Sequence, residues 1–154
     1  MTPKVRTCLW FDGKAEEAAH YYVSLIPGSH IDRVFRRDPG GPALTVAFTL
    51  AGTPYQALNG GPHFTFTEAA SISVTTEDQG ETDRLWSALT SDGGKESRCG
   101  WLKDKFGLSW QIVPARLPEL LADPDPARSK RAMQAMLQMS KIDIPRLEAA
   151  ADGR

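Results

Sequence analysis

Apolar and polar residues follow one another over the first sixty positions in an order typical of a strand, a helix and three further strands. Residues 5–11 are rich in β-branched and aromatic side chains, and the turn pair Asp12-Gly13 that follows can also cap a helix. Between residues 14 and 26 apolar side chains recur every three or four positions, which predicts an amphipathic helix ended by Pro27-Gly28. Three more strands are expected after it, at His30–Arg36, Ala43–Leu50 and Thr53–Leu58.

The same order begins again after the loop Asn59–Pro62. Strict alternation at 70–75 predicts a strand, and an apolar stripe within Gln79–Thr90 predicts a helix. Three short strands should follow, at 95–98, 100–105 and 108–113. Two βαβββ repeats, residues 4–61 and 69–114, predict an α+β fold in which a curved, partly barrel-like mixed sheet carries helices outside. The concave inner face of such a sheet is a common place for a small-molecule pocket.

Beyond Pro114 the composition changes to Leu, Ala and Met, and residues 115–154 are expected to form a helical C-terminal extension. The pair Asp125-Pro126 is typical of a helix start, and Asp143 can cap a last short helix. An apolar stripe is formed by Ala132, Met133, Met136, Leu137 and Met139. Such a stripe is more often a packing surface than a cofactor site. It is open whether it packs within the subunit or on a partner, and a contribution to a homodimer is favoured.

Composition limits the classes of partner. The 154 residues, with 18 basic and 19 acidic side chains and a formal net charge of −1, fit a single domain, residues 1–154, and lack the positive field that nucleic-acid binding needs. The cluster Arg33, Arg36 and Arg37 is interpreted as a solvated or edge-strand feature. No apolar run reaches the roughly 18–20 residues of a membrane span, and no signal-peptide pattern begins the chain, so a cytoplasmic protein is expected. Cys8 and Cys99 are expected to be reduced thiols, Cys8 buried and inert, and their spacing excludes structural zinc.

Three segments, together with the repeat, resemble one family: Phe11–Ala18, Leu58–Phe64 and Gly100–Gln111. Over about residues 4–140 the chain resembles PhnB-like members of the vicinal oxygen chelate superfamily. This superfamily includes glyoxalases, bleomycin-resistance proteins and extradiol dioxygenases, and the PhnB-like branch also carries the label 3-demethylubiquinone-9 3-methyltransferase domain. The sequence contains no Rossmann glycine pattern, P-loop or methyl-donor glycine loop, so its motifs do not support methyl transfer.

The resemblance also implies where a metal would bind. Metal-using members take ligands from the first strand of each half, usually histidine, and from the last strand of each half, usually glutamate. In this chain those positions fall on Val5 (or Thr7 in a register shifted by two), Ser71, Gln56 (or Leu58) and Gln111. Valine has no donor atom, and the hydroxyl and amide donors are neutral, so the charge that holds a transition metal is missing. No tightly held metal or other cofactor is therefore expected, and a divalent ion is disfavoured.

The concave face is expected instead to bind a small polar or aromatic molecule through neutral hydrogen-bonding groups. Gln56 and Gln111 stand at corresponding places in the two halves, and each amide can donate and accept. The alternative is that these two side chains satisfy each other or the backbone. The predicted ligand-binding residues are Thr7, Gln56, Asn59, Ser71, Ser73, Ser109 and Gln111.

His63, which follows Gly61-Pro62 on a loop, is the candidate catalytic acid or base, with a structural role as the alternative. His20 and His30 have no visible chemical companion in the sequence. The leading hypothesis is a homodimeric, small-molecule-binding glyoxalase-like protein, and whether turnover occurs is open. Two other hypotheses remain: a metal-dependent lyase, isomerase or dioxygenase, and a drug-sequestering protein like the bleomycin-resistance branch.

Overall fold

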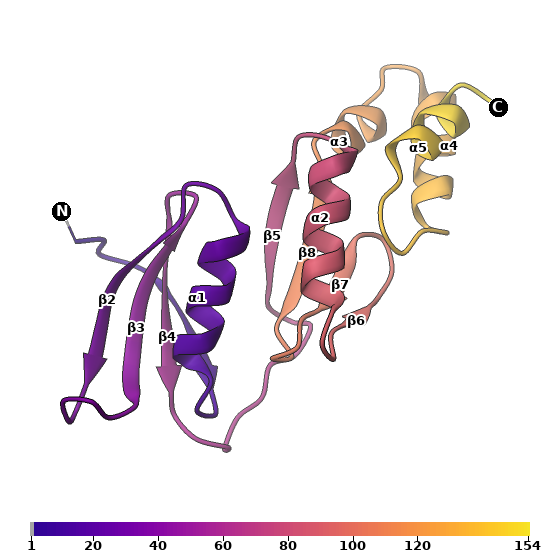
Figure 1. The fold of residues 1–154 in the computed structure, drawn as a ribbon. Helices are drawn as coiled ribbons and strands as arrows, with labels where there is room; N and C mark the ends of the chain where they lie inside the picture. Colours follow the sequence, from indigo (N-terminus) through magenta and orange to yellow (C-terminus); the bar gives the residue numbers. More distant parts are fainter. Residues whose placement is uncertain (1) are drawn as a thin grey trace. The chain divides into compact units, whose positions relative to one another are not determined.

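The computed structural model describes residues 2–154. The chain divides into two compact units, one ending at Phe66 and the other spanning Thr67–Arg154. Each unit contains one strand-helix-strand-strand-strand repeat and one four-stranded mixed sheet (Figure 1). The predicted α+β class and the predicted βαβββ duplication are therefore confirmed.

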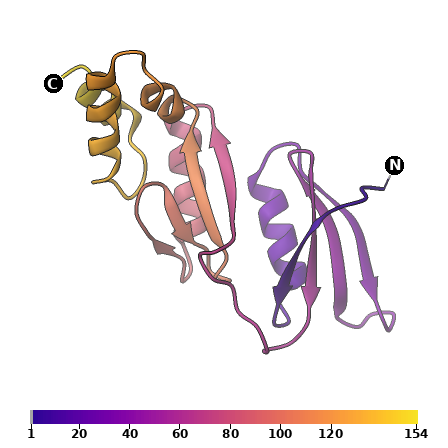
Figure 2. The ribbon, with the colours of Figure 1, turned by 180° about the vertical axis from the view of Figure 1, so that it is seen from behind.

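The first sheet has the strand order β1-β4-β3-β2, with β1 parallel to β4 and the other neighbours antiparallel. The helix α1 (Ala15–Leu25) lies along one face of this sheet in both views (Figures 1 and 2). Tyr22 of the helix and Val46, Phe48 and Ala57 of the sheet are fully buried between them. The bounds of its strands are β1 (Thr7–Phe11), β2 (His30–Arg36), β3 (Ala43–Leu50) and β4 (Thr53–Asn59).

The N-terminus of α1 is capped by a residue of β4, which is distant in sequence and adjacent to β1 in the sheet. Its N-cap residue, Lys14, makes no side-chain cap. The Asn59 Oδ1 atom instead accepts a hydrogen bond of 2.9 Å from the Ala15 N–H, and the Asn59 Nδ2 atom donates one of 2.9 Å to the Ala43 carbonyl. The expected cap from Asp12-Gly13 is therefore wrong, because Asn59, paired with Phe11, brings a cap from β4 to the place where β1 leads into the helix.

The second sheet has the order β5-β8-β7-β6 and packs one face against α2 (Gln79–Thr90). Asp78 caps this helix by accepting a 2.8 Å hydrogen bond from the Glu81 N–H at Oδ1. Leu85, Leu89 and Trp110 are buried between the helix and the sheet. The bounds of the strands are β5 (Ser71–Thr76), β6 (Lys95–Glu96), β7 (Trp101–Lys103) and β8 (Ser109–Pro114).

Several strand ends differ from the prediction. The first strand begins at Thr7, and Val5 lies before it with its side chain 80% exposed. The strands predicted at 95–98 and 100–105 are shorter because the chain turns between them, with positive φ angles of 57° at Cys99 and 84° at Gly100. The turn after β7 is closed by a 2.9 Å hydrogen bond from the Gly107 N–H to the Asp104 carbonyl.

The C-terminal extension belongs to the second unit. It consists of α3 (Arg116–Leu121), α4 (Pro126–Met136) and α5 (Ile144–Ala151), and the predicted caps at Asp125 and Asp143 are confirmed. Ala132 and Met139 of the apolar stripe are buried in a core shared by these helices, whereas Met133 and Leu137 are 40% and 48% exposed. Part of the stripe therefore packs within the chain. Among residues 2–154 no helix is long and apolar enough to cross a membrane.

Candidate functional site

The face of the first sheet that is turned away from α1 is called here the open face. The pairing register of the strands decides which side chains lie on it. Gln56 pairs with Cys8 on β1 and with Ala47 on β3, so these three side chains lie on the open face. Thr7 pairs with Tyr55, on the helix side, so the expectation that Thr7 shares a face with Gln56 is wrong. Cys8 is exposed on the open face and not buried as expected, and its Sγ lies 3.9 Å from the Gln56 Nε2 atom.

A β-bulge in β2 changes which side chains of this strand lie on the open face. His30 pairs with Thr49 and Arg33 pairs with Ala47, so the register shifts between Ile31 and Arg33 and Asp32 is the extra residue. Strict alternation would turn Arg33 toward the helix, but the inserted residue returns it to the open face. The bulge therefore places a carboxylate and a guanidinium next to each other on the same side of the sheet.

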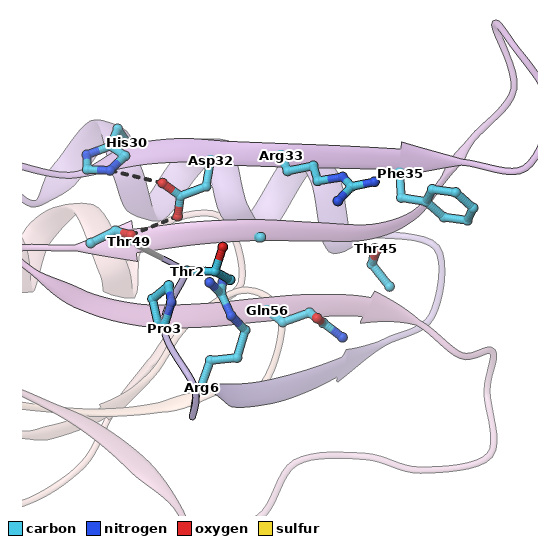
Figure 3. Close-up of a pocket in the computed structure, with 11 residues that line it drawn as sticks. Thr2, Pro3, Arg6, His30, Asp32, Arg33, Phe35, Thr45, Thr49 and Gln56 are labelled. Atoms are coloured by element: carbon cyan, nitrogen blue, oxygen red, sulfur yellow. Dashed lines mark hydrogen bonds and ion pairs between the residues drawn. The ribbon is translucent and has the colours of Figure 1, made fainter.

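A pocket of about 810 Å³ lies on the open face, between the N-terminal segment and strands β2, β3 and β4 (Figure 3). Gln56 and Ala47 line it near the middle of the sheet, and Arg6 reaches it from the segment before β1. Its remaining lining side chains from the strands are His30, Asp32, Arg33, Phe35, Thr45 and Thr49. One of the seven predicted ligand-binding residues, Gln56, is thus part of this pocket.

One end of the pocket carries a chain of hydrogen-bonded side chains. The His30 Nε2 atom lies 3.0 Å from Asp32 Oδ1, and the Thr49 hydroxyl donates a 2.7 Å hydrogen bond to Asp32 Oδ2. The carboxylate therefore orients an imidazole whose side chain is 62% exposed, and an oriented, accessible imidazole can serve as a general acid or base. The expectation that His30 has no chemical companion is wrong, and the spacing of His30 and Asp32, two residues apart on a strand, is the signal that could have found the pair.

Two guanidinium groups also line the pocket. Arg33 and Arg6 both line it, and Arg6 Nη1 donates a 2.7 Å hydrogen bond to the Tyr55 carbonyl. Within residues 2–154 neither guanidinium is paired with a carboxylate. Arg33 is exposed, as expected from the sequence, and it also lines the pocket. The sequence contains no signal for this placement, because it depends on the bulge.

Two other predicted site residues lie elsewhere. His63 is exposed on the loop after β4 and is not among the residues that line the pocket, so its catalytic role stays a prediction. Asn59 uses both ends of its amide to hold α1 and β3 together, as described above. Its observed role is structural, and its role in ligand binding also stays a prediction.

The four remaining predicted residues come together on the second sheet. Ser71 pairs with Ser109 and Ser73 pairs with Gln111, so all four lie on the face turned away from α2. The Gln111 Nε2 atom donates a 3.0 Å hydrogen bond to the Ser71 Oγ atom. The expectation of a shared hydroxyl and amide face is therefore confirmed for this sheet, while the binding of a ligand there stays a prediction.

Ser109 on this face has an unusual environment. Its side chain is 1% exposed, and its Oγ atom has no hydrogen-bond partner in the part of the chain that the structure describes. Lys103, which pairs with Ser109 in the sheet, forms an ion pair with Glu68. The hydrogen bond that Lys103 donates to Glu68 holds the pKa of the Glu68 carboxyl below its ordinary value. A recess of about 220 Å³ is lined by Ser109, Lys103, Glu68 and Trp101, among others.

The residues at the superfamily's metal positions do not fit a tightly held divalent ion. Val5 lies outside β1 and Thr7 faces the helix side, so neither joins Gln56 on the open face. Ser71 and Gln111 offer neutral oxygens and are bonded to each other. Among residues 2–154 no group of three or more His, Cys, Asp or Glu side chains could hold a metal ion.

The family described as 3-demethylubiquinone-9 3-methyltransferase matches residues 3–113. A PhnB protein from Bacillus cereus is similar to the chain, with 35% sequence identity, a TM-score of 0.67, and coverage of 73% of this chain and 100% of that one. No match was found among curated proteins.

Two more distant solved structures share the fold. A glyoxalase/bleomycin resistance protein from Albidiferax ferrireducens is 10% identical, with a TM-score of 0.50 over 71% of this chain and 95% of that one. A fosfomycin resistance protein from Listeria monocytogenes, solved with Mn(II), is 11% identical, with a TM-score of 0.53 over 73% of this chain and 92% of that one. At these identities the similarity shows the fold alone.

Proposed function

This chain belongs to the family described as 3-demethylubiquinone-9 3-methyltransferase, the PhnB-like branch of the glyoxalase and bleomycin-resistance fold, and we propose that it binds a small molecule in the pocket on the open face of the first sheet. The observation that carries the proposal is the pocket itself. Its volume of about 810 Å³ lies within the range of about 300–1,000 Å³ that is usual for ligand sites. Apolar side chains such as Phe35 and Ala47 stand beside the hydrogen-bonding Gln56, Thr45 and Thr49.

Binding, and not methyl transfer, is the proposed activity, because the sequence contains no methyl-donor glycine loop. Binding is also proposed to need no tightly held metal, because the donors at the family's ligand positions are neutral or face different sides of the sheet. Protein purified without chelator is then expected to be free of metal. Near-stoichiometric zinc, nickel or iron in an elemental analysis would contradict this part of the proposal.

The site is tested by filling it. Ala47 is a small side chain on the open face between Arg33 and Gln56, so Ala47→Trp places an indole in the pocket without touching the core beneath α1. We expect fragments that bind the wild type to shift the backbone amide NMR signals of Thr45, Thr49 and Gln56, and we expect Ala47→Trp to abolish those shifts. The matched control is Ala127→Trp, an exposed position on α4 outside the pocket. Fragments that bind both variants as they bind the wild type would overturn the site.

A homodimer is proposed as the working state of the chain. Phe64 in the first unit is 65% exposed, and Met133 and Leu137 add apolar surface in the second. Met133 and Leu137 lie one turn apart at the end of α4, and contiguous exposed apolar surface is typical of faces that a partner covers. Light scattering during size-exclusion chromatography is expected to give the mass of two chains, and the mass of one chain at all micromolar concentrations would contradict the proposal.

A further inference from the structure

We propose that the pocket on the open face takes an anionic small molecule, whose charged oxygen atoms lie against Arg33 and whose apolar part lies against Phe35. This inference rests on the proposed function, because it names the class of ligand for the same pocket. An anionic ligand also differs from the ligand expected from the sequence, which was a small polar or aromatic molecule held by neutral hydrogen-bonding groups. The difference comes from side chains that the register of β2 places on the open face.

The charges that line the pocket are unequal. Arg6 and Arg33 contribute two guanidinium groups, against the single carboxylate of Asp32. That carboxylate is already engaged at both oxygens, by His30 at 3.0 Å and by Thr49 at 2.7 Å. In Figure 3 the Asp32 side chain points toward Thr49, whereas the guanidinium of Arg33 extends the other way, toward Phe35. The guanidinium of Arg33 thus points away from the Asp32 carboxylate, in a chain whose formal net charge is −1.

Arg33 and Arg36 lie three residues apart and have different environments. Arg36 lies on the helix side, where it forms an ion pair of 2.5 Å with Glu16 and donates a 2.9 Å hydrogen bond to the Gly41 carbonyl. Its donors therefore serve the fold. Arg33 is turned to the open face by the bulge at Asp32 and, within residues 2–154, has no carboxylate partner. Bulges commonly re-aim a side chain next to a functional site, and this one presents a guanidinium to the pocket.

The chemistry of the two side chains defines the ligand. A guanidinium offers a planar fork of N–H donors that matches a carboxylate or phosphate group. Phe35, on the same face and paired with Thr45, is 45% exposed and offers a ring to an apolar or aromatic group. A small aromatic carboxylate would satisfy both side chains at once, with Gln56 and Thr45 available for further hydrogen bonds.

The test compares benzoate with benzamide, which have nearly the same shape and differ in charge. Backbone amide NMR titrations of the full chain are expected to show that benzoate binds in the pocket about tenfold more tightly than benzamide. Arg33→Gln should remove this preference, and Arg33→Lys should keep part of it because it keeps the charge. The matched control is Arg37→Gln, which removes an exposed arginine outside this pocket and should leave the preference unchanged.

The outcomes separate the inference from the function on which it rests. Equal affinities for benzoate and benzamide in the pocket would overturn the anionic class and leave the proposed binding function standing. A benzoate preference that survives Arg33→Gln would overturn the role of Arg33. If benzoate shifts the amide NMR signals of the second sheet alone, the inference is overturned. The fragment titration of Ala47→Trp then tests the proposed function by itself. A well-dispersed spectrum is required of each variant, as the check that it is folded.

Discussion

Replacing Ser109 with alanine should make the protein more stable. The Ser109 side chain is 1% exposed, and its Oγ atom has no hydrogen-bond partner within residues 2–154. A hydroxyl buried without a partner costs about 1–3 kcal/mol. Alanine removes that hydroxyl and leaves a gap of one atom, whose lost contacts cost less than about 1 kcal/mol. We therefore expect Ser109→Ala to raise the free energy of unfolding by about 1 kcal/mol, and Tm by about 2–4 °C in a chain of this length.

Urea unfolding followed by tryptophan fluorescence measures this change. Trp86, Trp101 and Trp110 all lie in the second unit, so the signal reports mainly on the unit that contains Ser109. The matched control is Ser73→Ala, an exposed hydroxyl on the same face, which should change the free energy of unfolding by no more than about 0.5 kcal/mol. If Ser109→Ala instead lowers stability by 1 kcal/mol or more, the hydroxyl is hydrogen-bonded in solution, and the reasoning from an unpaired group fails.

Three further predictions concern the fold that holds the site. Asp104 is 2% exposed and accepts three N–H groups, so Asp104→Asn should lose about 2–3 kcal/mol of stability in the urea assay, and an unchanged midpoint would contradict this. Lys141 holds the pKa of the Asp83 carboxyl below its ordinary value, so the contact stabilises the fold fully above about pH 4 and is lost as the pH falls through the lowered pKa. At pH 7 the free energy of unfolding of Asp83→Asn should therefore be lower than that of the wild type by less than about 1 kcal/mol, and this difference should vanish in acid. A difference that does not change with pH would contradict the contact between Lys141 and Asp83. In Gly60→Ala the added methyl group would collide with the Trp10 ring, so we expect a loss of about 1–3 kcal/mol and a shifted tryptophan emission, and a wild-type spectrum would refute the contact.

The order of helices and strands could be predicted from the sequence because it depends on the local spacing of apolar residues. The ranges His30–Arg36, Ala43–Leu50 and Gln79–Thr90 coincide with β2, β3 and α2. Alternation of two residues and recurrence of three or four residues distinguish strands from helices without knowledge of the neighbours. The cap residues Asp125 and Asp143 are equally local, since each binds an N–H only two or three residues ahead.

The contents of the pocket could not be predicted, because they depend on pairing between strands. Alternation counted along β2 turns Arg33 toward α1, and only the register with β3 shows that Asp32 is an extra residue. The same limit applies to Asn59, whose partners Ala15 and Ala43 are distant in sequence. Four of the predicted polar residues share one face of the second sheet because β5 and β8 alternate without interruption.

The crystal structure of the protein soaked with benzoate is the most direct test of the central claim, that the open face of the first sheet is a ligand site. The account predicts density for the probe in the pocket, with its carboxylate hydrogen-bonded to the Arg33 guanidinium and its ring against Phe35. Density on the second sheet, with the pocket beside Gln56 filled only by solvent, would contradict it.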